Sequence, residues 1–349
     1  MKKKRLLIII LCIFVVLCPS FIYFSIKPVS SEKNKITERI EVPSGTTMRN
    51  ISKNLKKKNL IRSSTAFYIC SRYKIPRYII TGSSEPFLLK SGVYRISNSM
   101  TYSEILKILS SGQQEYIKLS FPEGLTISKI ASRLAENGVC SVEEFENSTK
   151  DKNLLNEYGL QGESFEGFLF PDTYFFTPKM TGKAVIKEMA DNFFEKLKDI
   201  PGAEKLTKEQ LYKTVTLASI VEREYRIEKE ASLIASVFYN RLKHNIGLYS
   251  CATIEYIITE IQKRPHPDVI TYSDLAIDSS YNTYKWAGLP PGPISNPGVI
   301  SLNAAINPAK TDYYFFRLVD SSTGRHVFTK DFSTHVNEGY IYNTKKSGK

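Results

Sequence analysis

The chain has 349 residues, of which 42% are hydrophobic and 24% are charged, and its formal net charge is +13. This length and composition fit about two globular domains and exclude a chain too polar to bury a core. The charge is uneven: residues 1–77 hold 17 Lys/Arg against 3 Asp/Glu, a balance of +14, whereas the remainder holds 31 against 32. The larger, C-terminal part of the chain is therefore almost neutral.

The first 30 residues differ from the rest of the chain. A basic N-terminus, 1–5, precedes an uncharged and largely apolar stretch at 6–26, which can cross a hydrocarbon layer ~30 Å thick as one helix. The alternative is a cleaved signal peptide, but its apolar region is usually shorter and ends at small residues, which do not stand out here. We predict a single-pass anchor in the cytoplasmic membrane, with 1–5 in the cytoplasm, a linker at 27–39 and the rest on the extracytoplasmic side.

The basic stretch that follows the predicted anchor indicates an anionic partner. Anionic lipid headgroups or an anionic envelope polymer would suit it. Nucleic acid conflicts with the predicted location and with the lack of a recognisable binding motif, so we expect no nucleic-acid partner. For the run at 56–58, a solvated helix end is the simpler interpretation.

The cysteines and histidines indicate neither a disulfide framework nor a metal site. Cys70, Cys140 and Cys251 are scattered singles without CxxC spacing, which leaves open one disulfide with one free thiol or three free thiols. The four histidines form no HExxH pattern. We predict no metal and no cofactor.

A sequence repeat opens the globular part. Residues 42–51 and 121–130 match at a constant offset of 79, and the match continues through Leu55 with Leu134. Each copy is typical of a short strand, a Pro/Gly turn and a capped amphipathic helix. Between the copies, a strand at 92–96 and a helix that begins at a capping-box pattern complete a compact βα module at 40–115.

Longer helices and a hairpin are expected beyond residue 142. One amphipathic helix is predicted at 183–197 and one or two more at 207–242. A stiff Pro/Gly-rich loop follows at 288–293. Two runs rich in β-formers, 313–318 and 326–329, bracket turn residues and predict a hairpin. The overall class is α+β.

The most informative residue is Glu222, a carboxylate in an apolar helical run. At 3.6 residues per turn, Leu211, Val215, Ala218 and Glu222 share one face, so the carboxyl group points where a core side chain would. Desolvation should raise its pKa, and the group could then donate a proton near neutral pH. A buried structural Glu paired with Arg241 is the alternative, and the helix alone leaves both open.

Five segments, in order, resemble the YceG-like endolytic murein transglycosylases. They are Pro122-Glu-Gly-Leu125, Glu166-Gly-Phe-Leu-Phe-Pro-Asp-Thr-Tyr174, Ala218-Ser-Ile-Val-Glu-Arg-Glu224, Val237-Phe-Tyr-Asn-Arg-Leu242, and Tyr281-Asn-Thr-Tyr284 leading to Gly288-Leu-Pro-Pro-Gly-Pro293. The resemblance covers about 40–338 plus the anchor. It implies a LysM-like glycan-binding module at 40–115, a catalytic domain at 116–342 before a basic tail at 343–349, and Glu222 as acid/base. It also implies peptidoglycan glycan strands as substrate, with cell-wall synthases as further partners.

Two positions depart from the family pattern. Cys251-Ala252-Thr253 stands where Asp-Pro-Thr is usual, and His335-Val336 where His-Asn is usual. The first change could alter support for the catalytic Glu. For His335, a structural position at a helix start is the better interpretation.

A lytic transglycosylase needs one carboxyl group, whereas hydrolysis normally needs two. Glu222 would protonate the bridging oxygen and then draw the proton from the C6 hydroxyl, closing a 1,6-anhydro ring on N-acetylmuramic acid. The residues nominated for the substrate groove are Asn240, Tyr281, Asn282, Gly288, Leu289 and Pro290, with Pro291 closing the loop segment. Their alternative roles are buried hydrogen bonding and packing.

Other carboxylates keep two rival functions open. Glu224 lies about 200° around the helix from Glu222, so we expect it to be a supporting or surface group. Glu166 and Asp172 are fallback second carboxylates, or alternatively a turn residue and a cap. A hydrolytic muramidase would use one of them, and a non-catalytic glycan-binding scaffold would use none.

Overall fold

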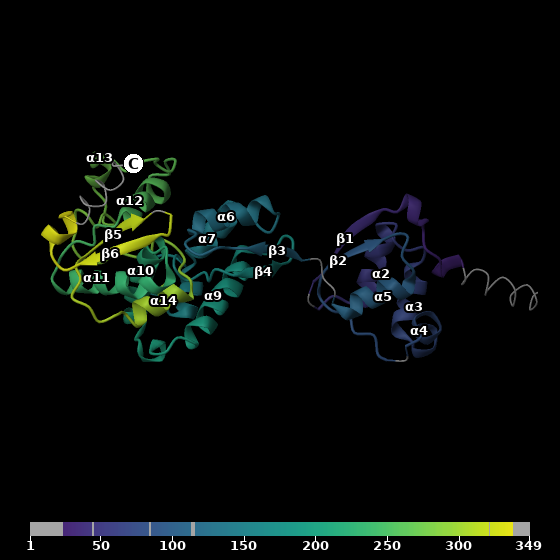
Figure 1. Cartoon of the computed structure of the whole chain (residues 1–349). Coiled ribbons are helices and arrows are strands. Elements are labelled where there is room, and N and C mark those ends of the chain that lie inside the picture. The colour runs from purple at the N-terminus through teal and green to yellow at the C-terminus, as the bar shows by residue number, and fades with distance from the viewer. Residues whose placement is uncertain (1–23, 44, 84, 113–115, 321, 338–349) are drawn as a thin grey trace, which may run out of the picture. The chain divides into compact units, whose positions relative to one another are not determined.

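A computed structural model describes residues 24–43, 45–83, 85–112, 116–320 and 322–337, and the chain divides into two compact units between Tyr116 and Ile117 (Figure 1). The predicted anchor at 6–26 lies outside the described residues except for its last three positions. Within the described ranges, none of the helices has the length and apolar character needed to span a bilayer. Helices and short two-stranded sheets occur in both units, which confirms the α+β class.

The N-terminal unit packs helices against one antiparallel strand pair, β1 (Thr37–Val42) with β2 (Gly92–Ser97). Its other elements are η1 (Glu32–Asn34), α2 (Met48–Lys57), α3 (Ser64–Arg72), α4 (Lys74–Thr81) and α5 (Tyr102–Ser111). The expected capping box is present, because the Thr101 side chain accepts from Glu104 N while Glu104 accepts from Thr101 N. Ile40, Leu55, Phe67 and other apolar side chains form a core of the unit's own.

The sequence repeat is also a structural repeat. Helix α2 and helix α6 (Ile127–Glu136) begin and end at the same offset of 79 as the sequence match. Each follows a glycine in the left-handed region, Gly45 with φ +78° and Gly124 with φ +76°, where a side chain would be strained. The first copy lies in the N-terminal unit and the second opens the C-terminal unit.

The C-terminal unit is mainly helical, with two short antiparallel pairs. Strand β3 (Ile117–Ser120) pairs with β4 (Thr173–Phe176), and β5 (Phe315–Asp320) pairs with β6 (Arg325–Thr329) as the predicted hairpin. Besides α6, its helical elements are α7 (Val142–Thr149), α8 (Lys152–Tyr158), α9 (Gly182–Lys198), η2 (Ala203–Lys205), α10 (Lys208–Glu224), η3 (Glu228–Glu230), α11 (Ala231–Lys243), α12 (Cys251–Tyr256), the π-helical turn η4 (Ile257–Ile261), α13 (Tyr272–Leu275) and α14 (Val299–Ile306).

Helix α10 runs through the centre of this unit. It begins at a capping box formed by Thr207 and Gln210, and every residue from 214 to 221 is buried. Val215 and Ala218 face one apolar core, and Leu217 and Ile220 face a second. Helix α14, which the sequence did not predict, packs against α10 and α11 (Figure 1). The last turn of α10 therefore leaves the interior next to α14.

Candidate active site

Glu222 lies in the last turn of α10 and is held by the first turn of α14. The Gly298 N–H donates to Glu222 Oε2 at 2.9 Å, and the Ser301 hydroxyl donates to the same oxygen at 2.7 Å. Gly298 is the N-cap of α14 and Ser301 its third residue, so the carboxyl group sits at a helix N-terminus. Arg241 instead donates to the carbonyls of Tyr314 and Leu248, so the structure gives no Glu222–Arg241 pair.

Two opposing effects act on the pKa of Glu222. Burial is the larger and raises the pKa, while the hydrogen bonds from Gly298 and Ser301 lower it. The nearby charge of Glu123 raises it again, and a hydrogen bond with the Tyr225 hydroxyl lowers it. The net shift is upward, as the apolar face of the helix predicted. A half-buried group with stabilising donors can hold a proton and can also exist as the anion.

The loop between β3 and α6 covers Glu222 from a second side. A Cβ built on Gly124 would lie 3.6 Å from Glu222 Cγ, so the backbone of this loop passes close to the carboxyl group. Glu123 is exposed and lies against Gly298, where an added Cβ would come within 2.6 Å of Glu123 Cγ. The sequence reasoning missed Glu123 as a site residue. The repeat offered a signal for Glu123, because the second copy has this carboxylate where the first copy has the uncharged Ser44.

Asn296 ties this loop to the motif at 166–174. Its backbone N–H donates to Leu125 O and its carbonyl accepts from Gly124 N, both at 2.9 Å. Its side chain donates to Leu125 O and Glu166 Oε1 and accepts from Leu169 N. Asn296 is 1% exposed, so these bonds are shielded from water. Sequence reasoning did not find this residue either.

Glu166 is a buried carboxyl group at the N-terminus of α6. The Thr126 side chain makes no cap bond there and donates to Glu260, while Glu166 accepts the Ile127 N–H at 3.1 and 3.2 Å. Burial raises its pKa to about 8, and the charge of Glu260 adds to the shift. The structure thus places Glu166 in a loop-organising role beside Asn296.

Two of the nominated groove residues have their amides engaged in loop structure. Asn282 is 0% exposed, donates to the carbonyls of Leu275 and Ile277, and accepts from Tyr284 N. Asn240 donates to Thr311 O and Tyr313 O at 3.0 and 2.9 Å. Both arrangements match the hydrogen-bonding alternative given for these residues.

The other nominated residues lie in the loop that follows α13. Tyr281 is half-buried and stacks at a tilt on Tyr256, with ring centroids 5.1 Å apart. Pro290 is buried and Leu289 is partly buried against the second core. Gly288 has φ +102° and open space around it. The loop approaches the 166–174 motif at Gly167, where an added Cβ would meet Pro293 at 2.6 Å.

Glu224 lines a cavity whose lining does not include Glu222. It accepts a hydrogen bond from Ser250, and burial raises its pKa. The cavity has a volume of about 740 Å³ and also contains Arg241, Cys251 and His335. His335 stacks on Phe315, and Cys251 Sγ lies 3.0 Å from the Tyr284 hydroxyl. Cys251, from the first departure, and His335, which precedes the second departure at Val336, therefore line the Glu224 cavity.

Asp172 is exposed and stands directly before strand β4, so the cap predicted for it is wrong because no helix begins there. Its Oδ1 accepts from Thr173 N at 2.7 Å and its Oδ2 from Asn192 Nδ2 at 3.2 Å. Cys70, Cys140 and Cys251 are free thiols. In the described part of the chain, no group of three or more His, Cys, Asp or Glu side chains is arranged to hold a metal ion.

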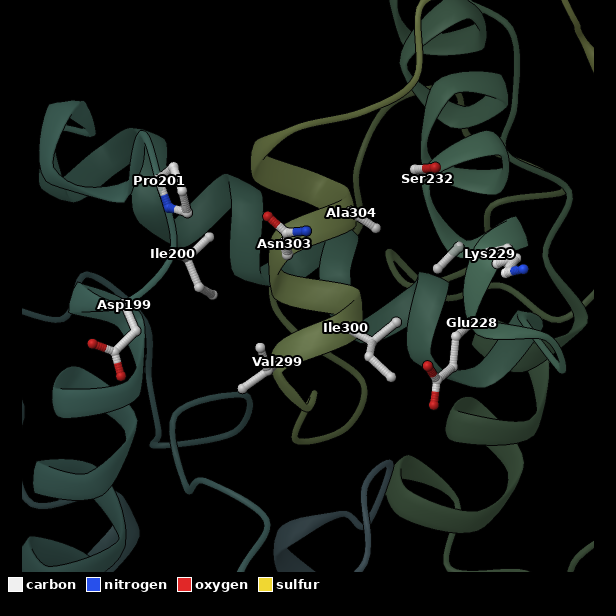
Figure 2. A pocket seen from close by; sticks show the side chains of 11 residues that line it. Asp199, Ile200, Pro201, Glu228, Lys229, Ser232, Val299, Ile300, Asn303 and Ala304 are labelled. Carbon is white, nitrogen blue, oxygen red and sulfur yellow. The ribbon is translucent and has the colours of Figure 1, made fainter.

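An open groove of about 500 Å³ begins at Val299, directly after Gly298 (Figure 2). Helix α14 forms its floor, with Asp199 and Pro201 on one wall and Glu228 and Lys229 on the other (Figure 2). Val299 and Ile300 extend into the space between these walls. The groove thus offers an apolar floor and charged rims one residue away from a donor to Glu222.

Comparison with known proteins agrees with these motifs. The model of the YceG-like family matches residues 40–339. A protein of Bacillus subtilis (strain 168) named endolytic murein transglycosylase is 33% identical over 334 residues, which cover 90% of this chain and 88% of that protein. A protein of the same name from Streptococcus pneumoniae serotype 2 (strain D39 / NCTC 7466) is 27% identical over 341 residues, and the match spans 60% of its length.

A crystal structure of a YceG-like protein from Listeria monocytogenes is also similar. It has 30% sequence identity and a TM-score of 0.56, and the match covers 87% of this chain and 99% of that one. The family match extends over both units and includes every segment that positions Glu222. The chain belongs to the YceG-like family.

Proposed function

We propose that this protein is a membrane-anchored endolytic lytic transglycosylase that cuts the bond between N-acetylmuramic acid and N-acetylglucosamine in peptidoglycan and leaves a 1,6-anhydro end. The family match and its relatives' names identify the chain as an enzyme of the murein transglycosylase class. The observation that carries the finer proposal is Glu222, a half-buried carboxyl group with two donors on one oxygen at a helix N-terminus.

In the first step Glu222 acts as general acid. Because Gly298 and Ser301 both donate to Oε2, a proton on the carboxyl group belongs on Oε1. That proton passes to the bridging oxygen while the bond from C1 of N-acetylmuramic acid to this oxygen breaks. The raised pKa of Glu222 favours the protonated form that this step requires.

In the second step the same group acts as general base. The C6 hydroxyl oxygen of the muramic acid attacks C1, and its proton returns to Glu222, which restores the acid. The carboxylate formed between the steps is stabilised by Gly298, Ser301 and the N-terminus of α14. An attacking group on the same sugar needs no positioned water and gains from proximity. One carboxyl group therefore completes the cycle.

Hydrolysis is the second candidate, and Glu123 is the observation that favours it. This carboxylate lies beside Gly298 and acts electrostatically on Glu222, whereas Glu166 is buried and Glu224 lines the cavity with Cys251. A hydrolase would use Glu123 as the second carboxyl group that retention or inversion requires. The lytic route leaves it as a charge that tunes the acid.

The remaining parts of the proposal concern substrate and location. The groove in Figure 2 would hold sugar rings next to the cleaved bond, since it starts beside Gly298. The unit at 40–115 would bind glycan as a LysM-like module, and Tyr281 with the loop Gly288–Pro290 would contact the strand. The stretch at 6–26 would anchor the chain in the cytoplasmic membrane, where cell-wall synthases work.

The end groups of digested glycan test the reaction type. We expect the full chain to release fragments that end in 1,6-anhydro-muramic acid, one water lighter than reducing ends by mass spectrometry. The Glu222→Gln variant, treated identically, should release neither kind. Reducing ends from the wild-type protein would establish the hydrolase, and glycan that is bound but uncut would establish the scaffold.

Two substitutions around Glu222 should move the pH profile in opposite directions. Ser301→Ala removes a donor that lowers the pKa of Glu222, so the loss of activity on the basic side should move to higher pH. Glu123→Gln removes a charge that raises this pKa, so the same limb should move to lower pH. Initial rates of strand cleavage against pH give both shifts.

The size of the Glu123→Gln effect separates the two candidate reactions. With one acid/base, activity below the basic limb stays within a few-fold of wild type. With Glu123 as a second catalytic carboxyl group, activity falls by ~10²-fold or more at every pH. Shifts in the same direction for both variants would contradict the assignment of Glu222.

A further inference from the structure

Helix α4 presents its apolar side chains to solvent and its arginine to the interior. Ile75, Tyr78 and Ile79 are 73%, 59% and 75% exposed, and they follow the i, i+3, i+4 spacing of one helix face. Arg77, on the opposite side, is 7% exposed and donates to Ser71 O at 2.9 Å. This is the reverse of a surface helix in a soluble domain. An apolar face of this kind indicates a binding surface.

The apolar face extends beyond α4 and is surrounded by positive charge. Tyr73, at the junction with α3, is 58% exposed, and Leu88 in the following loop is 68% exposed. Arg72 and Lys74 flank Tyr73 and are exposed. Residues 24–77 hold 13 Lys/Arg against 3 Asp/Glu, a balance of +10. We call the four side chains Tyr73, Ile75, Tyr78 and Ile79 the α4 face.

The end of the predicted anchor, at Ser25, and the segment that follows it are fastened near the start of α3. The Tyr102 hydroxyl donates to Ser25 O at 2.8 Å and also contacts Ser63, the N-cap of α3. Arg62 donates to the carbonyls of Pro28 and Val29. Helix α3 has nine residues and is about 14 Å long at 1.5 Å per residue. The α4 face is thus a short distance from the point where the chain would leave the membrane.

We propose that the α4 face inserts into the headgroup region of an anionic bilayer. Isoleucine and tyrosine side chains fit the boundary between headgroups and acyl chains, and the flanking cations fit anionic lipid. This inference rests on the membrane anchor of the proposed function. The α4 face would add a second contact with the same membrane. Two contacts fix the orientation of the N-terminal unit relative to the bilayer, whereas a tether alone leaves it free to rotate.

Tryptophan fluorescence of the full chain in nanodiscs tests the insertion. The chain has one tryptophan, Trp286, so Ile79→Trp in a Trp286→Phe background places the only fluorophore on the α4 face. We expect emission to be quenched by phosphatidylcholine with brominated acyl chains when phosphatidylglycerol is present, and less without the anionic lipid. Ile75→Ser with Tyr78→Ser should release the quenching, because losing two apolar side chains shifts the docking equilibrium by roughly tenfold or more.

A matched reporter controls for general proximity to the disc. Val269 lies in the C-terminal unit and is 74% exposed. A tryptophan reporter placed there by Val269→Trp, in the same background, should stay unquenched. A chain that co-purifies with nanodiscs while the Ile79→Trp reporter remains unquenched overturns the docking and leaves a protein partner or a second copy as occupant. A chain that does not co-purify at all overturns the anchor as well, so the two failures are distinguishable.

Discussion

Glu222→Gln is expected to abolish strand cleavage and leave the fold intact. The amide cannot donate the proton that the leaving oxygen needs or accept one from the C6 hydroxyl, and one positioned acid/base contributes ~10² to 10⁴ in rate. The amide oxygen still accepts from Gly298 N and the Ser301 hydroxyl, so the α10–α14 contact survives. We expect the free energy of unfolding to stay within about 0.5 kcal/mol of wild type.

Glu224→Gln is the matched control on the same helix. Both residues are glutamates in the last turn of α10, but Glu224 is bound by Ser250 and lines the cavity with Cys251. It should retain cleavage within a few-fold of wild type. Initial rates on purified glycan, together with thermal unfolding of each variant, make the comparison. Cleavage that survives in Glu222→Gln and disappears in Glu224→Gln would place the chemistry in the cavity that Glu224 lines.

The sequence predicted the elements that carry strong local signals. The capping box at Thr101, and the turn residues between the two runs rich in β-formers that make the hairpin, mark their own boundaries. Helix α14 lacks such a signal. Its eight residues, Val299–Ile306, are apolar almost throughout, so no periodicity separates a helix from a buried strand. The donors to Glu222 therefore could not be predicted from the sequence.

The residues of the candidate site also differ in whether a local sequence signal marks them. Glu222 was identified because a charge in an apolar helix is locally anomalous. Asn296 bonds residues more than 120 positions away, and Glu123 acts on Glu222, which is 99 positions away; no local pattern reports either interaction. Asn282 shows the converse, because a polar residue in a recognised motif turned out to be fully buried and bonded to loop carbonyls. A motif thus identifies a segment without distinguishing contact with substrate from support of a loop.

Substitution of Glu166 should have the second-largest effect of those considered, and the property affected should be stability. Glu166→Ala leaves the Ile127 N–H and one N–H of the Asn296 side-chain amide without an acceptor in the interior, and each unsatisfied donor costs about 1–3 kcal/mol. The loss of buried side-chain volume adds to this. We expect the free energy of unfolding of the C-terminal unit to fall by about 2–5 kcal/mol. Glu166→Gln keeps an acceptor and should cost much less.

The pH dependence of stability distinguishes the carboxyl group from a generic packing residue. Because burial raises the pKa of Glu166 to about 8, the folded state binds a proton that the unfolded state releases near 4.5, the ordinary value. This contribution is fully present below that ordinary value and is lost as the pH rises to about 8. Urea unfolding across this window should show wild-type stability falling with pH and a shallower fall in Glu166→Gln. Equal slopes would mean that Glu166 is ionised in the folded protein, bound as an anion at the N-terminus of α6. In that case Glu166 would carry a negative charge throughout this pH range, next to the Asn296 side chain that holds the loop beside Glu222.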